Sequence, residues 1–105
     1  MVIEELQFLV PQELLERFVL LDHKIWTATL AAQSGFLGKE IWRTADDPER
    51  LRIVIRWASR EAWKSVPRDV LDATERDFAQ ALGASVPVLR CTDLDVLDIG
   101  RAGSE

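Results

Sequence analysis

Residues 50–57 alternate between two sets of side chains, a pattern typical of a β-strand whose two faces meet different surroundings. Successive side chains of a strand point to opposite sides of its sheet, so every second residue shares a face. A strand with one apolar face needs a covering layer, and helices are the expected cover. The apolar face is predicted to hold Leu51, Ile53, Ile55 and Trp57, and the other face Arg50, Arg52, Val54 and Arg56.

Helical and extended patterns alternate along the rest of the chain. Ser59 is a suitable N-cap, Gly83 is a suitable helix end, and Asp46-Asp47-Pro48 is predicted to form a turn. Strands are predicted at residues 2–10, 36–43, 50–57 and within 86–99, and helices at 12–32, 60–65 and 67–82. This order predicts an α+β fold of the ferredoxin-like βαββαβ type, a four-stranded antiparallel sheet with helices on one face.

The chain has the length of one domain and an acidic net charge. Its 105 residues predict a single domain at 1–99 and a flexible C-terminal tail at 100–105. The net charge of −5 disfavours nucleic acid as a partner. No apolar run approaches the roughly 18 residues of a membrane span, and the acidic start lacks the basic region of a signal peptide. A cytoplasmic protein without a membrane partner is expected.

Cysteine and histidine each occur once, which excludes several kinds of site within one chain. Cys91 alone cannot form an internal disulfide or a cysteine-based zinc site, and His23 alone cannot supply a histidine metal cluster. No metal is therefore predicted. His23 is expected on the solvent side of its helix, and Cys91 is expected to pack as a small hydrophobe or to lie at a dimer edge.

One face of such a sheet stays open, and a second copy of the chain is expected to cover it. The first strand should lie between the third and the fourth, and Asp93 and Asp95 of the fourth are expected on the open face, where opposite charges would pair. The alternative is a solvated polar face. The predicted homodimer interface contains Glu5, Gln7, Arg52, Val54 and Arg56, with Ile3, Leu9 and Trp42 beside them.

Two segments resemble the dimeric α/β-barrel superfamily, which includes proteins similar to the antibiotic-biosynthesis monooxygenases. Residues 34–42, SGFLGKEIW, resemble its "PGFLG" segment at the start of a strand. Residues 55–63, IRWASREAW, resemble its "W-x-S-x-E-A-W" segment between a strand and a helix. An uncharacterised bacterial family within the group has runs similar to residues 22–27 and 56–61. The resemblance implies a dimeric α/β barrel and covers residues 1 to about 97.

The resemblance implies several chemistries, because the superfamily combines cofactor-free oxygenases, haem-degrading enzymes, isomerases and proteins without known activity. Haem degradation there uses a histidine on the helix after the third strand and an asparagine on the first strand. This chain has no histidine in that helix, and Gln7 is the nearest match to the asparagine, so no cofactor is expected. A cofactor-free oxygenase needs an apolar pocket for an aromatic substrate and polar groups that stabilise its anion.

The superfamily holds its substrate between the sheet and the helices of each subunit, and several aromatic residues of this chain are expected there. The alternative is that these side chains simply fill the core, which the large area that a tryptophan buries favours. The predicted ligand pocket contains Phe8, Trp26, Trp57, Trp63 and Phe78.

Asp22 borders the apolar stripe of the first helix and is the predicted catalytic base. It lies four residues after Phe18 and four before Trp26, so partial burial would raise the pKa of its carboxyl. The alternative is a structural acid that accepts a hydrogen bond from a tryptophan indole or pairs with Arg60 or Lys64.

Two hypotheses for function follow. The first is a dimeric α/β-barrel protein that acts as a cofactor-independent monooxygenase on a small aromatic molecule. The alternative is a non-catalytic protein of the same fold that binds a small ligand or serves in assembly. A deep cavity with polar groups favours the first hypothesis, and a solidly packed core favours the second.

Overall fold

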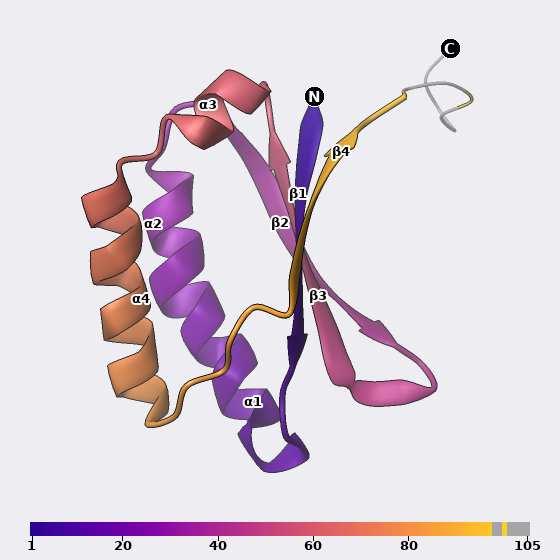
Figure 1. Ribbon diagram of the computed structural model, residues 1–105, viewed down its shortest axis with the longest axis vertical. Helices are drawn as coiled ribbons and strands as arrows, with labels where there is room; N and C mark the ends of the chain where they lie inside the picture. The colour runs from indigo at the N-terminus through magenta and orange to yellow at the C-terminus, as the bar shows by residue number, and fades with distance from the viewer. Residues whose placement is uncertain (98–99, 101–105) are drawn as a thin grey trace.

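Four antiparallel strands form one sheet, and helices cover one of its faces (Figure 1). The structure is a computed structural model that describes residues 1–97 and 100. The strand order β2-β3-β1-β4 confirms the predicted ferredoxin-like arrangement, with β1 between β3 and β4. The strands are β1 (Val2–Leu9), β2 (Phe36–Thr44), β3 (Asp47–Trp57) and β4 (Arg90–Asp95). The helices are α1 (Gln12–Leu21), η1 (Asp22–Thr27), α2 (Ala28–Ala31), α3 (Arg60–Lys64) and α4 (Arg68–Leu82).

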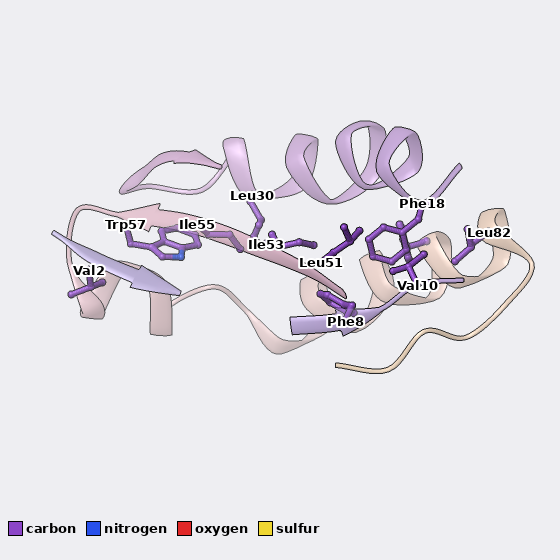
Figure 2. Packing of buried hydrophobic residues seen from close by; sticks show 11 residues of the cluster. Val2, Phe8, Val10, Phe18, Leu30, Leu51, Ile53, Ile55, Trp57 and Leu82 are labelled. Atoms are coloured by element: carbon purple, nitrogen blue, oxygen red, sulfur yellow. The ribbon is translucent and has the colours of Figure 1, made fainter. Parts of the chain in front are cut away.

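The hydrophobic core lies between the helices and the inner face of the two central strands (Figure 2). β1 and β3 are antiparallel, and Phe8 pairs with Leu51, so apolar side chains of both strands share one face. Phe18 packs edge-on against Phe8 and Phe78, with ring centroids 5.5 and 5.2 Å apart. The buried cluster contains Val2, Phe8, Val10, Phe18, Leu30, Leu51, Ile53, Ile55, Trp57, Phe78 and Leu82.

The first helical segment runs from Gln12 to Ala31, close to its predicted range, but its middle is a π-helix. A π-turn contains more residues than an α-turn, and such turns are frequent at functional sites. Asp22 begins this π-helix and is buried.

The turn between β2 and β3 differs from the predicted one. Thr44 pairs with Asp47, so residues 45–46 form the turn and β3 starts before Arg50. The Asp47 carboxylate accepts a hydrogen bond of 3.3 Å from Arg50 Nε, which holds this end of the strand. Pro48 is tolerated because it lies beyond the last pair between β1 and β3, where its missing N–H interrupts no bond to β1.

The two segments that carry the family resemblance are in contact. Gly35 has a φ of +86°, a left-handed conformation that glycine adopts without steric cost. A Cβ atom at this position would collide with the Cβ of Ala62 on α3. The carbonyl oxygen of Gly35 accepts a hydrogen bond of 2.8 Å from the backbone N–H of Ala58. The start of β2 is therefore fixed to the turn between β3 and α3.

Helices α3 and α4 lie within one residue of their predicted limits. Ser59 Oγ accepts a hydrogen bond of 3.1 Å from the backbone N–H of Ala62, which caps α3 as expected. Gly83 ends α4 with a φ of +77°, the left-handed helix end that glycine favours. The buried residues of α4 are Thr74, Phe78 and Leu82.

The last strand is shorter than predicted, and two of its side chains point the other way. β4 starts at Arg90, after an irregular segment that contains Pro87. Its register pairs Asp93 with Glu4 and Asp95 with Val2, so both aspartates lie on the helix side and not on the open face. Residues 98–99 of the predicted strand, and residues 101–105 of the predicted tail, lie outside the described residues.

Arg60 explains why the two aspartates of β4 are on the helix side. Its guanidinium on α3 donates hydrogen bonds to Asp93 at 2.7, 2.8 and 3.1 Å and to Asp95 at 2.9 Å. These contacts raise the pKa of Arg60 and lower the pKa of Asp93. The ion pairs connect α3 to the edge strand.

Candidate functional site

A cavity of about 610 Å³ lies between the inner face of the sheet and the helices. This size falls within the range of about 300–1,000 Å³ that is usual for small-molecule sites. The wall is mainly apolar, and Leu6, Leu30, Ile53 and Val66 are among the residues that form it. The cavity therefore has the size and the surface to enclose a compact apolar molecule.

All five aromatic residues predicted at the pocket lie in the wall of this cavity, and they also contribute to the core. Trp57 is completely buried, whereas Trp26 and Trp63 are half-buried against the core. The tryptophans therefore fill part of the interior and also bound a space. Their role in holding a ligand stays a prediction. The five residues are Phe8, Trp26, Trp57, Trp63 and Phe78.

Asp22 forms a buried ion pair with Lys39 of β2. Lys39 Nζ lies 2.7 Å from Asp22 Oδ2, and the two side chains are 5% and 4% exposed. The partners suggested by the sequence lie elsewhere, because Arg60 binds the aspartates of β4 and the Lys64 ammonium lies 3.9 Å from the centre of the Trp63 ring. Both members of the pair line the cavity. The role of Asp22 as a base stays a prediction.

A register shift in β2 points Lys39 toward the core, and the sequence pattern did not reveal it. The pairing with β3 shifts between Phe36 and Gly38, so Phe36 pairs with Trp57 and Lys39 pairs with Ile55. Simple alternation from Phe36 would place Lys39 on the opposite face. The irregularity places one extra residue in β2, so the side chains of Phe36 and Lys39 both face the helices.

Burial opposes both charges of the Asp22–Lys39 pair. Loss of contact with water raises the pKa of the Asp22 carboxyl and lowers the pKa of the Lys39 ammonium. Each partner's charge counteracts the shift of the other. The pair is neutral as a unit, so it adds polarity to the cavity wall without adding net charge.

Glu4 is a second acid in the wall, and it is not among the site residues predicted from the sequence. It lies on β1 and accepts a hydrogen bond of 3.1 Å at Oε1 from the indole Nε1–H of Trp57. Burial raises the pKa of the Glu4 carboxyl, while the Trp57 indole and the charges of Lys64 and Lys39 act in the opposite direction. The signal was present in the sequence, because Glu4 is two residues before Leu6 and shares its face.

Charged side chains lie where the cavity meets solvent. Lys64, Arg68 and Glu75 line the cavity and are exposed, which places the opening beside α3, α4 and the irregular segment 83–89. Partial burial raises the pKa of Glu75, and the indole of Trp26 counteracts that shift. A ligand that enters here would pass mobile charged side chains before it reaches the apolar interior.

The lone histidine and cysteine do not line the cavity. His23 is exposed, as expected. Cys91 is exposed on β4 and pairs with Leu6, which puts it on the helix side of the sheet, and partial burial raises the pKa of its thiol. Within residues 1–97 and 100, no group of three or more His, Cys, Asp or Glu side chains could hold a metal ion. None of the helices in this range is long and apolar enough to cross a membrane.

The five residues predicted at the dimer interface share the open face of the sheet. Val54 is only 2% exposed there, while Trp42 is 46% and Leu94 is 40% exposed. Arg52 Nε is buried and has no hydrogen-bond partner among the described residues. A shallow hollow of about 340 Å³ on this face is lined by Ile3, Glu5, Trp42, Val54, Arg56 and Leu94, among others. Its role in assembly stays a prediction.

The fold and the cavity define a small α+β protein of the ferredoxin-like class with a ligand-sized space between sheet and helices. The sequence model of the family described as "Antibiotic biosynthesis monooxygenase" matches residues 1–66. The chain therefore belongs to the antibiotic biosynthesis monooxygenase family, which confirms the resemblance seen in residues 34–42 and 55–63. No curated protein matches the chain.

Solved structures with the same fold include a named oxygenase. Two structures of SnoaB, a cofactor-independent oxygenase from Streptomyces nogalater, are 19% and 20% identical to this chain. The first covers 91% of this chain and 92% of its own, with a TM-score of 0.68. The second covers 90% of this chain and 91% of its own, with a TM-score of 0.67. Rv0793 from Mycobacterium tuberculosis is 20% identical and covers 95% of this chain and 98% of its own, with a TM-score of 0.62. At these identities the likeness is one of fold.

Proposed function

We propose that this protein is a cofactor-independent oxygenase that acts on a small aromatic hydroxyl compound held between the sheet and the helices. The observation that carries the proposal is the apolar cavity of about 610 Å³ with carboxyl and ammonium groups in its wall. Such a site excludes water around an aromatic ring and still offers groups that move a proton and stabilise an anion. Membership of the family and the fold shared with SnoaB support the same chemistry.

The reaction needs O₂ as its only co-reactant. A base removes the hydroxyl proton, and the resulting anion is electron-rich enough to reduce O₂. The ring carbon para to the hydroxyl forms a bond to one oxygen atom and loses its hydrogen as a proton, and the O–O bond breaks. One oxygen stays as the carbonyl of a quinone and the other leaves as water. The substrate loses four electrons and each oxygen atom gains two.

The side chains of the wall have distinct proposed roles in this reaction. The aromatic residues hold the ring, and a carboxyl group of the wall, with Asp22 the predicted one, accepts the proton. The Lys39 ammonium lies in the same wall and stabilises the negative charge that develops on the substrate.

Oxygen uptake with 1-naphthol tests the proposed activity. We expect the protein, dialysed against a chelator, to consume O₂ and form the quinone faster than buffer does. Val66→Trp places a large ring in the cavity and should abolish this acceleration, whereas Leu20→Trp adds the same ring at an exposed site of α1 and should preserve it. Binding of 1-naphthol without oxygen uptake would instead favour a non-catalytic ligand-binding protein.

We also propose that two copies of the chain pair through the open faces of their sheets. The buried Arg52 nitrogen without a partner and the exposed Trp42 and Leu94 support this arrangement, because a second sheet would supply acceptors and cover apolar surface. The charges of this face include an ion pair of 3.2 Å between Arg56 and Glu40, which a partner would leave in place.

Arg52→Glu is expected to weaken this dimer. A carboxylate at position 52 would join Glu5 and Glu40 on the open face. Two such faces carry like charges toward each other, which is strongly unfavourable across an interface. We expect the dissociation constant to rise at least tenfold, about 1.4 kcal/mol, in sedimentation equilibrium. Arg76→Glu makes the same charge change on the exposed side of α4 and should leave the dimer unchanged. An unchanged mass for Arg52→Glu would contradict the proposed interface.

A further inference from the structure

We propose that Glu4, and not Asp22, accepts the proton of the bound ligand, and that the ligand class is consequently a neutral phenol. This inference deepens the proposed function and rests on its assumption that the cavity binds an aromatic hydroxyl compound. It names a residue for the proton transfer and it excludes anionic aromatic acids as the preferred ligands.

Glu4 keeps acceptor capacity at the cavity. Its Oε1 accepts the Trp57 indole hydrogen at 3.1 Å, and the Trp63 indole also acts on the carboxyl as a hydrogen-bond donor. β1 is one of the two central strands of the sheet, so paired backbone on both sides fixes the position of Glu4. An ionised carboxylate has about four acceptor positions, so one that accepts from two indoles can still accept from a hydroxyl group.

Asp22 is less suited to the same task because its charge is already compensated. Its Oδ2 lies 2.7 Å from Lys39 Nζ, and both side chains are almost completely buried. Removal of a ligand proton by Asp22 would leave the Lys39 charge without its partner in a low-dielectric interior, which is costly. Glu4 has no ion-pair partner of this kind within the described residues, so a proton on Glu4 leaves the Asp22–Lys39 pair intact.

The charges around Glu4 determine which ligand fits. Lys39 of β2 and Lys64 of α3 favour its ionised form, while Asp93 and Cys91 of β4, Asp22 of η1 and Glu75 of α4 belong to the same surroundings. An anionic ligand would meet three carboxyl groups in the wall, those of Glu4, Asp22 and Glu75. The buried ammonium of Lys39 is already paired, and the cations of Lys64 and Arg68 are exposed at the opening. A neutral phenol meets an acceptor instead, and proton transfer to Glu4 then keeps the total charge of the cavity constant.

Ligand binding without oxygenation tests this inference separately from the proposed reaction. The probe is 4-chloro-1-naphthol, used without O₂ so that it cannot be oxidised, and the reference is its methyl ether, which has no proton to give. Quenching of tryptophan fluorescence measures both dissociation constants, and the absorption band of the naphtholate measures the ionised fraction of the bound probe.

We expect the wild-type protein to bind the naphthol about ten- to hundredfold more tightly than the ether, the usual value of a hydrogen bond to a charged group. The preference should be present above the raised pKa of Glu4 and be lost as the pH falls through it, because protonation removes the acceptor charge. Glu4→Gln should lower the preference about tenfold or more and reduce the ionised fraction. Glu4→Asp should restore part of the binding preference and part of the ionised fraction. Circular dichroism should confirm that each variant is folded.

Two variants complete the test. Glu16→Gln makes the same change at an exposed position of α1 and should leave preference and ionisation unchanged. Asp22→Asn should retain the naphthol preference if Glu4 takes the proton. The inference would be overturned if the bound probe loses its ionisation in Asp22→Asn but keeps it in Glu4→Gln. Failure of the probe to bind the wild-type protein would also overturn it. If ionisation of the bound probe depends on Glu4 but the protein consumes no O₂ with 1-naphthol, the inference is upheld and only the proposed reaction is refuted.

Discussion

Lys39→Met is expected to lower the free energy of unfolding by about 3–5 kcal/mol at neutral pH, the usual cost of breaking a buried ion pair by removing one partner. Lys39 Nζ is 2.7 Å from Asp22 Oδ2, and neither side chain has appreciable contact with solvent. The substitution leaves the Asp22 carboxylate buried without its compensating charge. Urea denaturation followed by circular dichroism measures the loss.

The pH dependence of this loss follows from the Asp22 carboxyl. Burial raises its pKa in the folded protein above the unfolded value, so its contribution to stability is present at low pH and is lost as the pH rises through the folded pKa. Without Lys39 that pKa should rise further. The deficit of Lys39→Met should therefore be largest at neutral pH and shrink as the pH falls through the raised pKa of Asp22, where the buried carboxyl takes up a proton.

A double variant serves as the matched control. Asp22→Leu combined with Lys39→Met replaces the pair by apolar side chains of similar shape, and such replacements are often neutral or stabilising. We expect most of the lost stability to return. If the single and double variants are equally unstable, the packing around position 39 and not its charge is responsible.

Gly35→Ala is expected to cost about 2–5 kcal/mol, the sum of about 1–2 kcal/mol for a left-handed alanine and about 1–3 kcal/mol for overpacking. The φ of Gly35 is +86°, and an added Cβ would collide with that of Ala62, so both costs apply at one position. The collision would separate the start of β2 from α3. Thermal and urea unfolding measure the effect.

Two other glycines separate the backbone cost from the collision. Gly83→Ala has the left-handed backbone with a φ of +77° but open space around the added Cβ, so only the first cost applies. Gly38→Ala has neither feature and should be close to neutral or slightly stabilising. A loss in Gly35→Ala no larger than that in Gly83→Ala would refute the proposed collision with Ala62.

The arrangement of elements was predictable because several local signals agree. The alternation of residues 50–57, the cap at Ser59 and the end at Gly83 each have a short-range physical cause, and the family match confirms the fold they imply. The position of Glu4 on the cavity side was also predictable, since the alternation of β1 puts it on the same face as Leu6. The aromatic residues of the cavity wall were predicted from the family resemblance, which places a pocket between the sheet and the helices.

The pairing between strands was the part that the sequence did not reveal. Lys39 faces inward because the β2–β3 register shifts beside it, and no local pattern marks that shift. Asp93 and Asp95 were predicted on the open face, but the register of β4 with β1 and the contacts of Arg60 place them on the helix side. The cavity itself depends on the distance between layers, which side-chain volumes do not determine.

Strand β1 separates the cavity from the hollow on the open face. Its even-numbered residues, such as Glu4, border the ligand-sized cavity, and its odd-numbered residues, such as Glu5, border the hollow on the open face. Under the two proposals, substitutions at even-numbered positions of β1 should alter ligand chemistry and those at odd-numbered positions should alter self-association. Gene copies that diverge would then be free to change the two proposed properties independently.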